Sequence, residues 1–339
     1  QRTLVGTPTT NVVAENAAGK MSVLASWRGH PGKPVQTTID AATQAAAERA
    51  VRSLPNSAAI VAIQPSTGKI LAVATHKAAH MPAVSALNGR YRPGQAFTIV
   101  STAGLINDGF SVSTHIPCVS SISVGGRTFT NQPHHLGLGP NPKFSTDFAN
   151  ACSTAFAGLS LRLSGTELAA AAKIFGFGSG WRLPLPASAS TLRIPSDAAQ
   201  AASDSVGMGK VAVSPLQMAL VAGMVQSGQW RQPSLVTGLG KQGLAPPPAF
   251  NPSAAAALRS LMLETVTSGA GRAAAIHGEA ISGQVANVSL GPAHDGLRVT
   301  WFVGYRGGVA FAVCEMTRSA SDSAAPVARQ FLQSLPAGS

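Results

Sequence analysis

The stretch Gly89-Arg90-Tyr91-Arg92-Pro93-Gly94-Gln95-Ala96-Phe97-Thr98 decides the fold of this chain. Its Pro-Gly pair predicts a turn, and the apolar residues that follow, through Leu105-Ile106, predict a helix. A turn that leads directly into a helix directs backbone N–H groups and the first side chains of the helix toward one place. Residues 89–107 therefore predict a site at the beginning of a helix.

The composition permits a large folded domain and narrows the classes of partner. The chain has 339 residues, of which 45% are hydrophobic, so one large domain or two are both possible. Only 11% of the residues are charged, yet the net charge is +12, which favours anionic partners such as cell-wall polymers, anionic lipid or nucleic acid. The cations are scattered singly, without a basic run or helix, so we do not expect a nucleic-acid partner.

The three cysteines, Cys118, Cys152 and Cys314, are too few for a disulfide scaffold, and their spacing fits no zinc pattern. We therefore expect neither a metal nor a cofactor. No stretch approaches the roughly 18 apolar residues that span a membrane, and no signal peptide is visible. Because the sequence begins with Gln1 and not with Met, we expect a fragment or a processed form from which an upstream anchor could have been removed.

Periodicity and capping signals outline the secondary structure. Helices are predicted over residues 41–53, 97–107, 146–163, 166–175, 214–226, 252–267 and 322–335, and strands over residues 57–63, 70–75, 281–288, 300–305 and 309–316. Asp40, Thr166 and Asn251 are the predicted caps of three of these helices. Residues 1–36 are polar and rich in Gly, Thr and Pro, which predicts a linker or a strand pair.

The order of the elements predicts two lobes. Strands occur early and late, with helices between them, which indicates an antiparallel sheet built from both ends of the chain and a helical lobe inserted in the middle. We place the sheet lobe at about residues 37–95 and 228–339 and the helical lobe at about 96–227. A cleft between the two lobes is the expected place for a site.

Seven stretches, each weak alone, together resemble the transpeptidase domain of penicillin-binding proteins, the peptidoglycan D,D-transpeptidases. They are Pro34–Asp40, Ile60–Ala74, Tyr91–Gly94, Ser153–Phe156, Val206–Gly209, Val213–Ala219 and Trp301–Tyr305. The resemblance covers nearly the whole chain from about Val35. It implies a penicillin-binding/β-lactamase-like fold of the α/β (α+β) class, with a five-stranded antiparallel sheet flanked by helices and an inserted all-helical lobe. Residues 37–339 would form this domain, and residues 1–36 would be the remnant of an upstream region.

The resemblance also shows where the catalytic motifs have degenerated. The family carries Ser-x-x-Lys, Ser-x-Asn and Lys-Thr-Gly. The aligned positions here are Gln95 and Thr98, then Ala151, Cys152 and Ser153, then Ile281, Ser282 and Gly283. A carboxamide is no nucleophile at neutral pH, and a hydroxyl cannot replace an amine that shuttles protons. The chain's one Ser-x-x-Lys, Ser66 to Lys69, lies in a predicted hairpin turn, where we interpret both residues as turn residues.

Two hypotheses of function follow. The first is a catalytically inactive member, with no catalytic residue, that binds or scaffolds in cell-wall assembly through cell-wall synthesis proteins or peptidoglycan. The alternative is an active serine or cysteine acyltransferase, a D,D-transpeptidase or carboxypeptidase, in which Cys152 or Ser153 is a relocated nucleophile.

By resemblance, the protein is extracytoplasmic and associated with the bacterial cell membrane through an upstream helix or lipid. That compartment is oxidising, so we predict a disulfide between Cys118 and Cys152, with Cys314 buried and free. A buried apolar role for Cys152 is the other interpretation.

Overall fold

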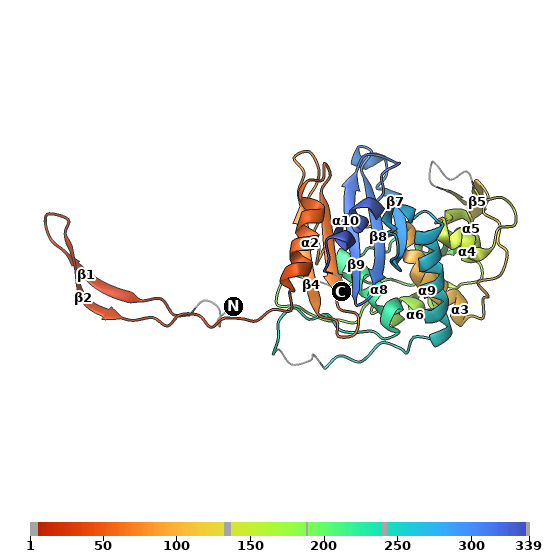
Figure 1. Cartoon of the computed structure of the whole chain (residues 1–339). Helices are drawn as coiled ribbons and strands as arrows, with labels where there is room; N and C mark the ends of the chain where they lie inside the picture. The colour runs from red at the N-terminus through yellow and green to blue at the C-terminus, as the bar shows by residue number, and fades with distance from the viewer. Residues whose placement is uncertain (1–5, 132–136, 188, 239–242, 337–339) are drawn as a thin grey trace. The chain divides into compact units, whose positions relative to one another are not determined.

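The computed structural model describes residues 6–131, 137–187, 189–238 and 243–336 (Figure 1). Their contacts divide the chain into two units. One contains the residues through Thr38 and the short stretch from Val236, and in it β1 (Thr10–Glu15) pairs with β2 (Met21–Trp27) in antiparallel register. The other unit contains the remaining elements. Its first residue, Ile39, lies close to the boundary predicted after residue 36.

The larger unit is built on the expected five-stranded antiparallel sheet, which is confirmed. The strand order is β4-β3-β9-β8-β7. The strands are β3 (Ala58–Ile63), β4 (Ile70–His76), β7 (Ser282–Ser289), β8 (Arg298–Arg306) and β9 (Val309–Thr317). β3 pairs with β9, so the early hairpin joins the late strands in one sheet. β3 and β9 are buried at every residue, which explains why β3 and residues Val309–Cys314 of β9 are continuously apolar and not alternating.

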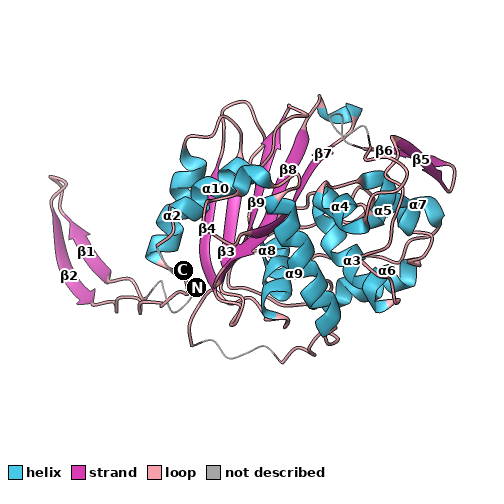
Figure 2. Cartoon of the chain, turned by 45° about the vertical axis from the view of Figure 1, so that its right-hand side comes forward, coloured by secondary structure: helices cyan, strands magenta, loops and turns pink. Residues whose placement is uncertain are grey.

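Helices cover both faces of this sheet, as Figure 2 shows. On one face lie α2 (Ala41–Arg52) and α10 (Ala325–Gln333), whose apolar residues pack with Ile60, Phe302 and Phe311. On the other lie α8 (Pro215–Ser227) and α9 (Pro252–Thr267), in the cluster that holds Val61 and Trp301. Successive strand residues thus serve opposite layers. We expected α8 in the helical lobe, but it contacts β3, β8 and β9 and is buried almost throughout.

The inserted lobe contains short helices and a small sheet. The helices are α3 (Thr98–Asn107), α4 (Phe144–Ala149), α5 (Ser153–Leu159), α6 (Gly165–Ile174) and α7 (Ala198–Ser205). We expected an all-helical lobe, but β5 (Ser121–Val124) and β6 (Arg127–Thr130) form a hairpin in it. Gly125 and Gly126 make its turn with φ of 58° and 77°, the pair of positive φ values that a tight hairpin turn requires. The described part of this unit also contains the 3₁₀ turns η1 (Gly94–Phe97), η2 (Arg272–Ala274) and η3 (Pro292–His294).

One predicted helix, residues 146–163, is in fact two. α4 ends at Ala149, and Ala151 follows in the left-handed region with φ of 54°. The Ala151 N–H donates to Phe148 O and the Cys152 N–H to Asp147 O, the paired bonds of a Schellman helix end. This position usually carries Gly, so the sequence gives no stop signal here.

Smaller corrections concern helix boundaries. Ser164, not Thr166, caps α6, and its hydroxyl forms a reciprocal capping box with Glu167. α7 was not predicted, and Asp197 caps it. α10 begins at Ala325 and not at Asp322. Within the described residues, no helix is both long enough and apolar enough to cross a bilayer.

A disulfide fastens the inserted lobe at the start of α5. Cys118 and Cys152 are joined, with their Cα atoms 6.2 Å apart, and Cys314 is free and buried in β9. Closing a loop of 34 residues stabilises the fold by about 4 kcal/mol in the chain-entropy model.

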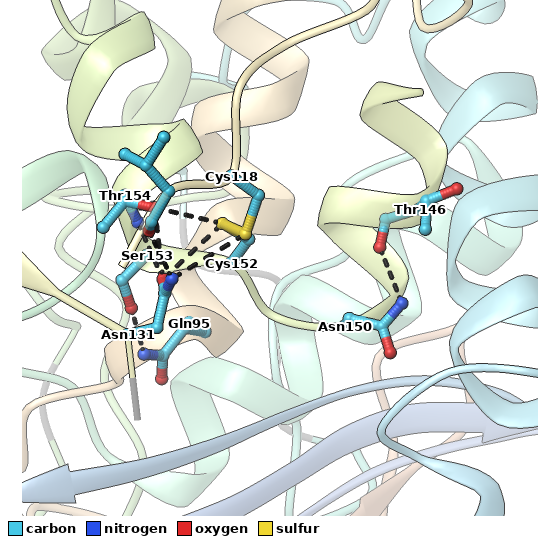
Figure 3. Close-up of a disulfide and its surroundings, with 9 residues drawn as sticks. Gln95, Cys118, Asn131, Thr146, Asn150, Cys152, Ser153 and Thr154 are labelled. Carbon is cyan, nitrogen blue, oxygen red and sulfur yellow. Dashed lines mark hydrogen bonds between the residues drawn. A yellow bond between two sulfur atoms is a disulfide. The ribbon is translucent and has the colours of Figure 1, made fainter. Parts of the chain in front are cut away.

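Next to the disulfide, the Asn131 carboxamide accepts the Thr154 N–H at 3.1 Å and donates to Val119 O at 2.8 Å (Figure 3). Asn131 thus caps α5 from outside the helix.

The side chain of Asp147 lies close to this disulfide in an unusual environment. It is fully buried, and neither carboxylate oxygen has a hydrogen-bond partner among the described residues. One of its oxygens and the sulfurs of Cys118 and Cys152 all lie within 4.8 Å of one another. Burial disfavours the charged form and raises the pKa of Asp147 to about 7. The folded chain therefore holds a proton at Asp147 that the unfolded chain releases at about pH 4.

This proton predicts how stability depends on pH. Because the folded state binds one proton more than the unfolded state between about pH 4 and pH 7, the free energy of unfolding falls as the pH rises through this window. Asp147→Asn keeps the site neutral at every pH. Its stability relative to the parent should therefore grow by about 2–3 kcal/mol between pH 5 and pH 8, as measured by chemical denaturation.

The matched control is Asp40→Asn. Asn is an equally good helix cap, and hydrogen bonds from Thr43 lower the pKa of Asp40, so this carboxyl does not titrate in that range. Its stability difference from the parent should be the same at pH 5 and pH 8. An Asp147→Asn difference that is equally constant would show that Asp147 is ionised in the folded protein.

Candidate functional site

Three segments bring the predicted site positions together: η1 with the start of α3, the α4–α5 connection, and β7. Two glycines set their spacing. Gly94 has φ of 53°, and a Cβ on it would lie 2.1 Å from the Val288 side chain in β7. A Cβ on Gly207 would lie 2.1 Å from Gly94 O, and Gly94 N–H donates to Gly207 O at 3.0 Å. The Pro-Gly turn therefore fits between β7 and the loop after α7 only because both residues lack side chains.

The side chains at the centre of this site form a buried polar cluster of four residues, Gln95, Thr98, Ser153 and Gln284. Gln95 Nε2 donates to Ser153 Oγ at 2.6 Å, a contact that Figure 3 shows beside the disulfide. Thr98 Oγ1 donates to the Gln95 backbone O at 2.6 Å, and Gln284 Nε2 lies 3.3 Å from Thr98 Oγ1. None of the four side chains is more than 1% exposed. Uncharged, hydrogen-bonded groups therefore fill the positions that the resemblance aligns with the nucleophile and the first lysine.

Gln284 is the residue of this cluster that the sequence analysis missed. It follows Gly283 on β7, one position beyond the third motif. Its carboxamide donates to Phe148 O at 2.9 Å and accepts the Val285 N–H at 2.9 Å. A carboxamide within the strand predicted over residues 281–288 was the available signal, since a buried carboxamide requires partners. The side chain ties β7 to the end of α4.

The remaining motif positions serve packing. Ile281 is 1% exposed and belongs to the apolar cluster of Phe311 and Phe331. Ser282 is hydrogen-bonded to the side chain of Tyr305, its cross-strand partner on β8. The pKa of Tyr305 is raised, mainly because the side chain is buried. A Cβ on Gly283 would lie 2.3 Å from the Phe302 ring, so a side chain is the close neighbour that requires glycine there.

Three other candidates have no catalytic arrangement. Cys152 is disulfide-bonded, so it has no free thiol that could act as a nucleophile. Cys118, Asp147 and Cys152 lie close enough together to suggest a metal site, but the disulfide leaves no thiolate to bind a metal ion. Ser66 and Lys69 are exposed in the β3–β4 turn, as interpreted from the sequence.

A cavity of about 370 Å³ remains beside the cluster, along the edge strand β7. Its lining includes Ala151 from the second motif, Val285 and Ala286 from β7, and the charged residues Arg272 and Asp322. Gln95, Thr98 and Ser153 do not line it. The open space at this site therefore lies along the β7 edge and not at Gln95.

Known proteins resemble this chain in sequence and in fold. The model of the penicillin-binding protein transpeptidase domain matches residues 58–333. Peptidoglycan D,D-transpeptidase PbpA of Mycolicibacterium smegmatis is 30% identical over 289 aligned residues, which cover 72% of this chain and 59% of that protein. The chain thus spans less than two thirds of the length of this relative.

Solved structures agree on the architecture. The penicillin G acyl-enzyme of penicillin-binding protein A from Mycobacterium tuberculosis superposes with a TM-score of 0.75 at 24% identity, covering 91% of this chain and 81% of that one. The D,D-transpeptidase domain of a peptidoglycan glycosyltransferase from Eggerthella lenta gives a TM-score of 0.76 at 20% identity, covering 98% of both chains. The match to the family model over most of the chain, on this fold, assigns the protein: it belongs to the family of penicillin-binding protein transpeptidase domains.

Proposed function

We propose that this domain is a catalytically inactive transpeptidase that binds or scaffolds in bacterial cell-wall assembly. The observation that supports this most is the polar cluster: Gln95 stands in the nucleophile position, and its carboxamide is bound to Ser153 inside the protein. A nucleophilic serine needs a base within hydrogen-bond reach and an open approach for substrate. Gln95 supplies no nucleophile, and Thr98 supplies no amine.

The alternative, a relocated nucleophile, has little support from the geometry. Ser153 keeps a hydroxyl, but this group is 1% exposed and accepts a hydrogen bond from an amide, which cannot take its proton. Cys152 is disulfide-bonded to Cys118 and therefore has no free thiol.

The cavity and the charge of this domain suit non-covalent binding to the cell wall. The cavity along β7 is concave and carries both an Arg and an Asp, which suits a peptide with polar groups. The net charge of +12 suits anionic wall material in general. The named relatives act on peptidoglycan, so we place this domain in the extracytoplasmic space with peptidoglycan or its synthesis proteins as partners. Attachment to the membrane through an upstream anchor belongs to the same proposal.

The first test is acylation. After incubation with excess penicillin G, intact-mass spectrometry should find no adduct on this domain, because no nucleophile is available to open the β-lactam ring. Penicillin-binding protein A of M. tuberculosis, whose penicillin G acyl-enzyme has been solved, is the positive control. An adduct mapped to Ser153 or to any other residue of the site would contradict the proposal.

The second test restores the motif residues. The triple variant Gln95→Ser, Thr98→Lys, Ile281→Lys should remain unacylated, because Ala151 and Ser153 still replace the second motif and the Gln284 carboxamide still contacts position 98. It should also lose about 3 kcal/mol or more of unfolding free energy, because both lysines enter positions that are at most 1% exposed.

Its control is Gln95→Ser alone, which introduces no charge and should destabilise the fold by less. Rapid acylation of the triple variant with unchanged stability would show that the site is still open and preorganised.

A further inference from the structure

A second cavity is lined in part by the residue before the Pro-Gly pair, and it carries three cations. Its volume is about 400 Å³. Arg92, Arg127 and Lys210 line it, from the turn before Gly94, from the start of β6 and from the loop after α7. All three are exposed. Among the described residues, the ion pairs within 4.0 Å are Arg306–Glu279 and Arg318–Asp295, so none of these three cations is neutralised by a salt bridge.

The walls of this cavity are held in place by buried contacts. Asp204 is fully buried, and its carboxylate accepts the N–H groups of Lys210 at 2.6 Å and Val211 at 3.3 Å. The Trp301 indole donates to Arg92 O at 3.0 Å, and the Arg127 guanidinium lies 5.6 Å from the centre of the Phe129 ring. The backbone at Arg92 and Lys210 is therefore fixed, and only the side-chain ends have to order on binding, which lowers the entropic cost.

One acid shares the cavity with the three cations. Asp197 lines it as the cap of α7, with its carboxylate accepting from Gln200 N–H at 2.8 Å and from Ser196 Oγ at 2.9 Å. A compact polyanion would meet three favourable charges and one repulsive charge here. A ligand that carries two or more carboxylates and one amine would pair with all four groups. Arginine guanidinium groups bind carboxylates in bidentate geometry, and the Asp197 carboxylate can pair with an ammonium group.

We propose that this cavity, lined by Arg92, Arg127, Asp197 and Lys210, is a binding site for an acidic peptide with one free amine, of the kind that peptidoglycan stem peptides provide. This inference rests on the proposed contact with the cell wall and gives that contact a second location, distinct from the cavity along β7. The domain would then hold a wall peptide by charge without any chemistry at the degenerate motifs.

The experiment is fluorescence-anisotropy titration of the full chain with a labelled tetrapeptide that carries two free carboxylates and one free amine, at about 50 mM salt to limit screening. The triple variant Arg92→Gln, Arg127→Gln, Lys210→Gln should bind at least about tenfold more weakly. The matched control, Arg52→Gln, Lys77→Gln, Arg329→Gln, removes the same net charge from exposed positions that do not line the cavity, and should bind within about twofold of the parent.

A second comparison tests the role of Asp197. The parent should prefer the free-amine peptide over its N-acetylated form several-fold, and Asp197→Asn should abolish this preference while keeping the helix cap. The thermal midpoint of each variant reports that it is folded.

The outcomes separate this inference from the proposed function. Binding by the parent that the cavity variant does not weaken would overturn the site, while the wall contact would stand. No binding of any wall-derived peptide by the parent would overturn the site and the direct wall contact, and would leave the cell-wall synthesis proteins as the partners in the proposed function. Inorganic polyphosphate that binds more tightly than the tetrapeptide, through the same three cations, would show that the site selects phosphate chains and would overturn the peptide assignment.

Discussion

The site depends on the Gln284 carboxamide more than on any other single group. Its amide donates to Phe148 O at the end of α4 and lies 3.3 Å from Thr98 Oγ1 at the start of α3, while its oxygen accepts the Val285 N–H on β7. This one side chain joins the three segments that carry the three family motifs. A buried amide without hydrogen-bond partners lowers the stability of the fold by about 1–3 kcal/mol. The three segments are therefore stabilised in the positions where they can hydrogen-bond with Gln284.

The same interaction shows how uncharged groups hold this part of the fold together. An active site keeps desolvated polar groups ready for a substrate at some cost in stability. Here the amides and hydroxyls of the polar cluster bond with one another and with the backbone. Gly94 and Gly207, which bring the turn against β7, still have neighbours that leave no room for a Cβ. The close packing of the Pro-Gly turn against β7 is therefore kept, while the proposed function has the groups that perform transpeptidase chemistry replaced.

Much of this could be predicted from the sequence, for physical reasons that differ between elements. The five strands carry local signals in the form of apolar runs and the Gly307-Gly308 turn, and helices such as Pro252–Thr267 carry capping residues. These elements occur where they were predicted. The break after Ala149 could not be predicted, because an alanine occupies the left-handed position that usually carries glycine. The motif positions could be aligned, but the role of Gln284 depends on partners 136 and 186 residues away in the chain. The cation cavity is likewise invisible in the sequence, since its residues come from three separate segments.

The most direct test of the central claim is the rate at which the side-chain amide protons of Gln95 and Gln284 exchange with solvent. With ¹⁵N-labelled glutamine, NMR can follow each side-chain NH₂ group, and Gln95→Leu and Gln284→Leu identify the two signals. If the polar cluster fills the site, both groups should exchange at least about a hundredfold more slowly than the exposed Gln330 amide. Exchange as fast as that of Gln330 would contradict the account, because it would show that the degenerate site is open to water.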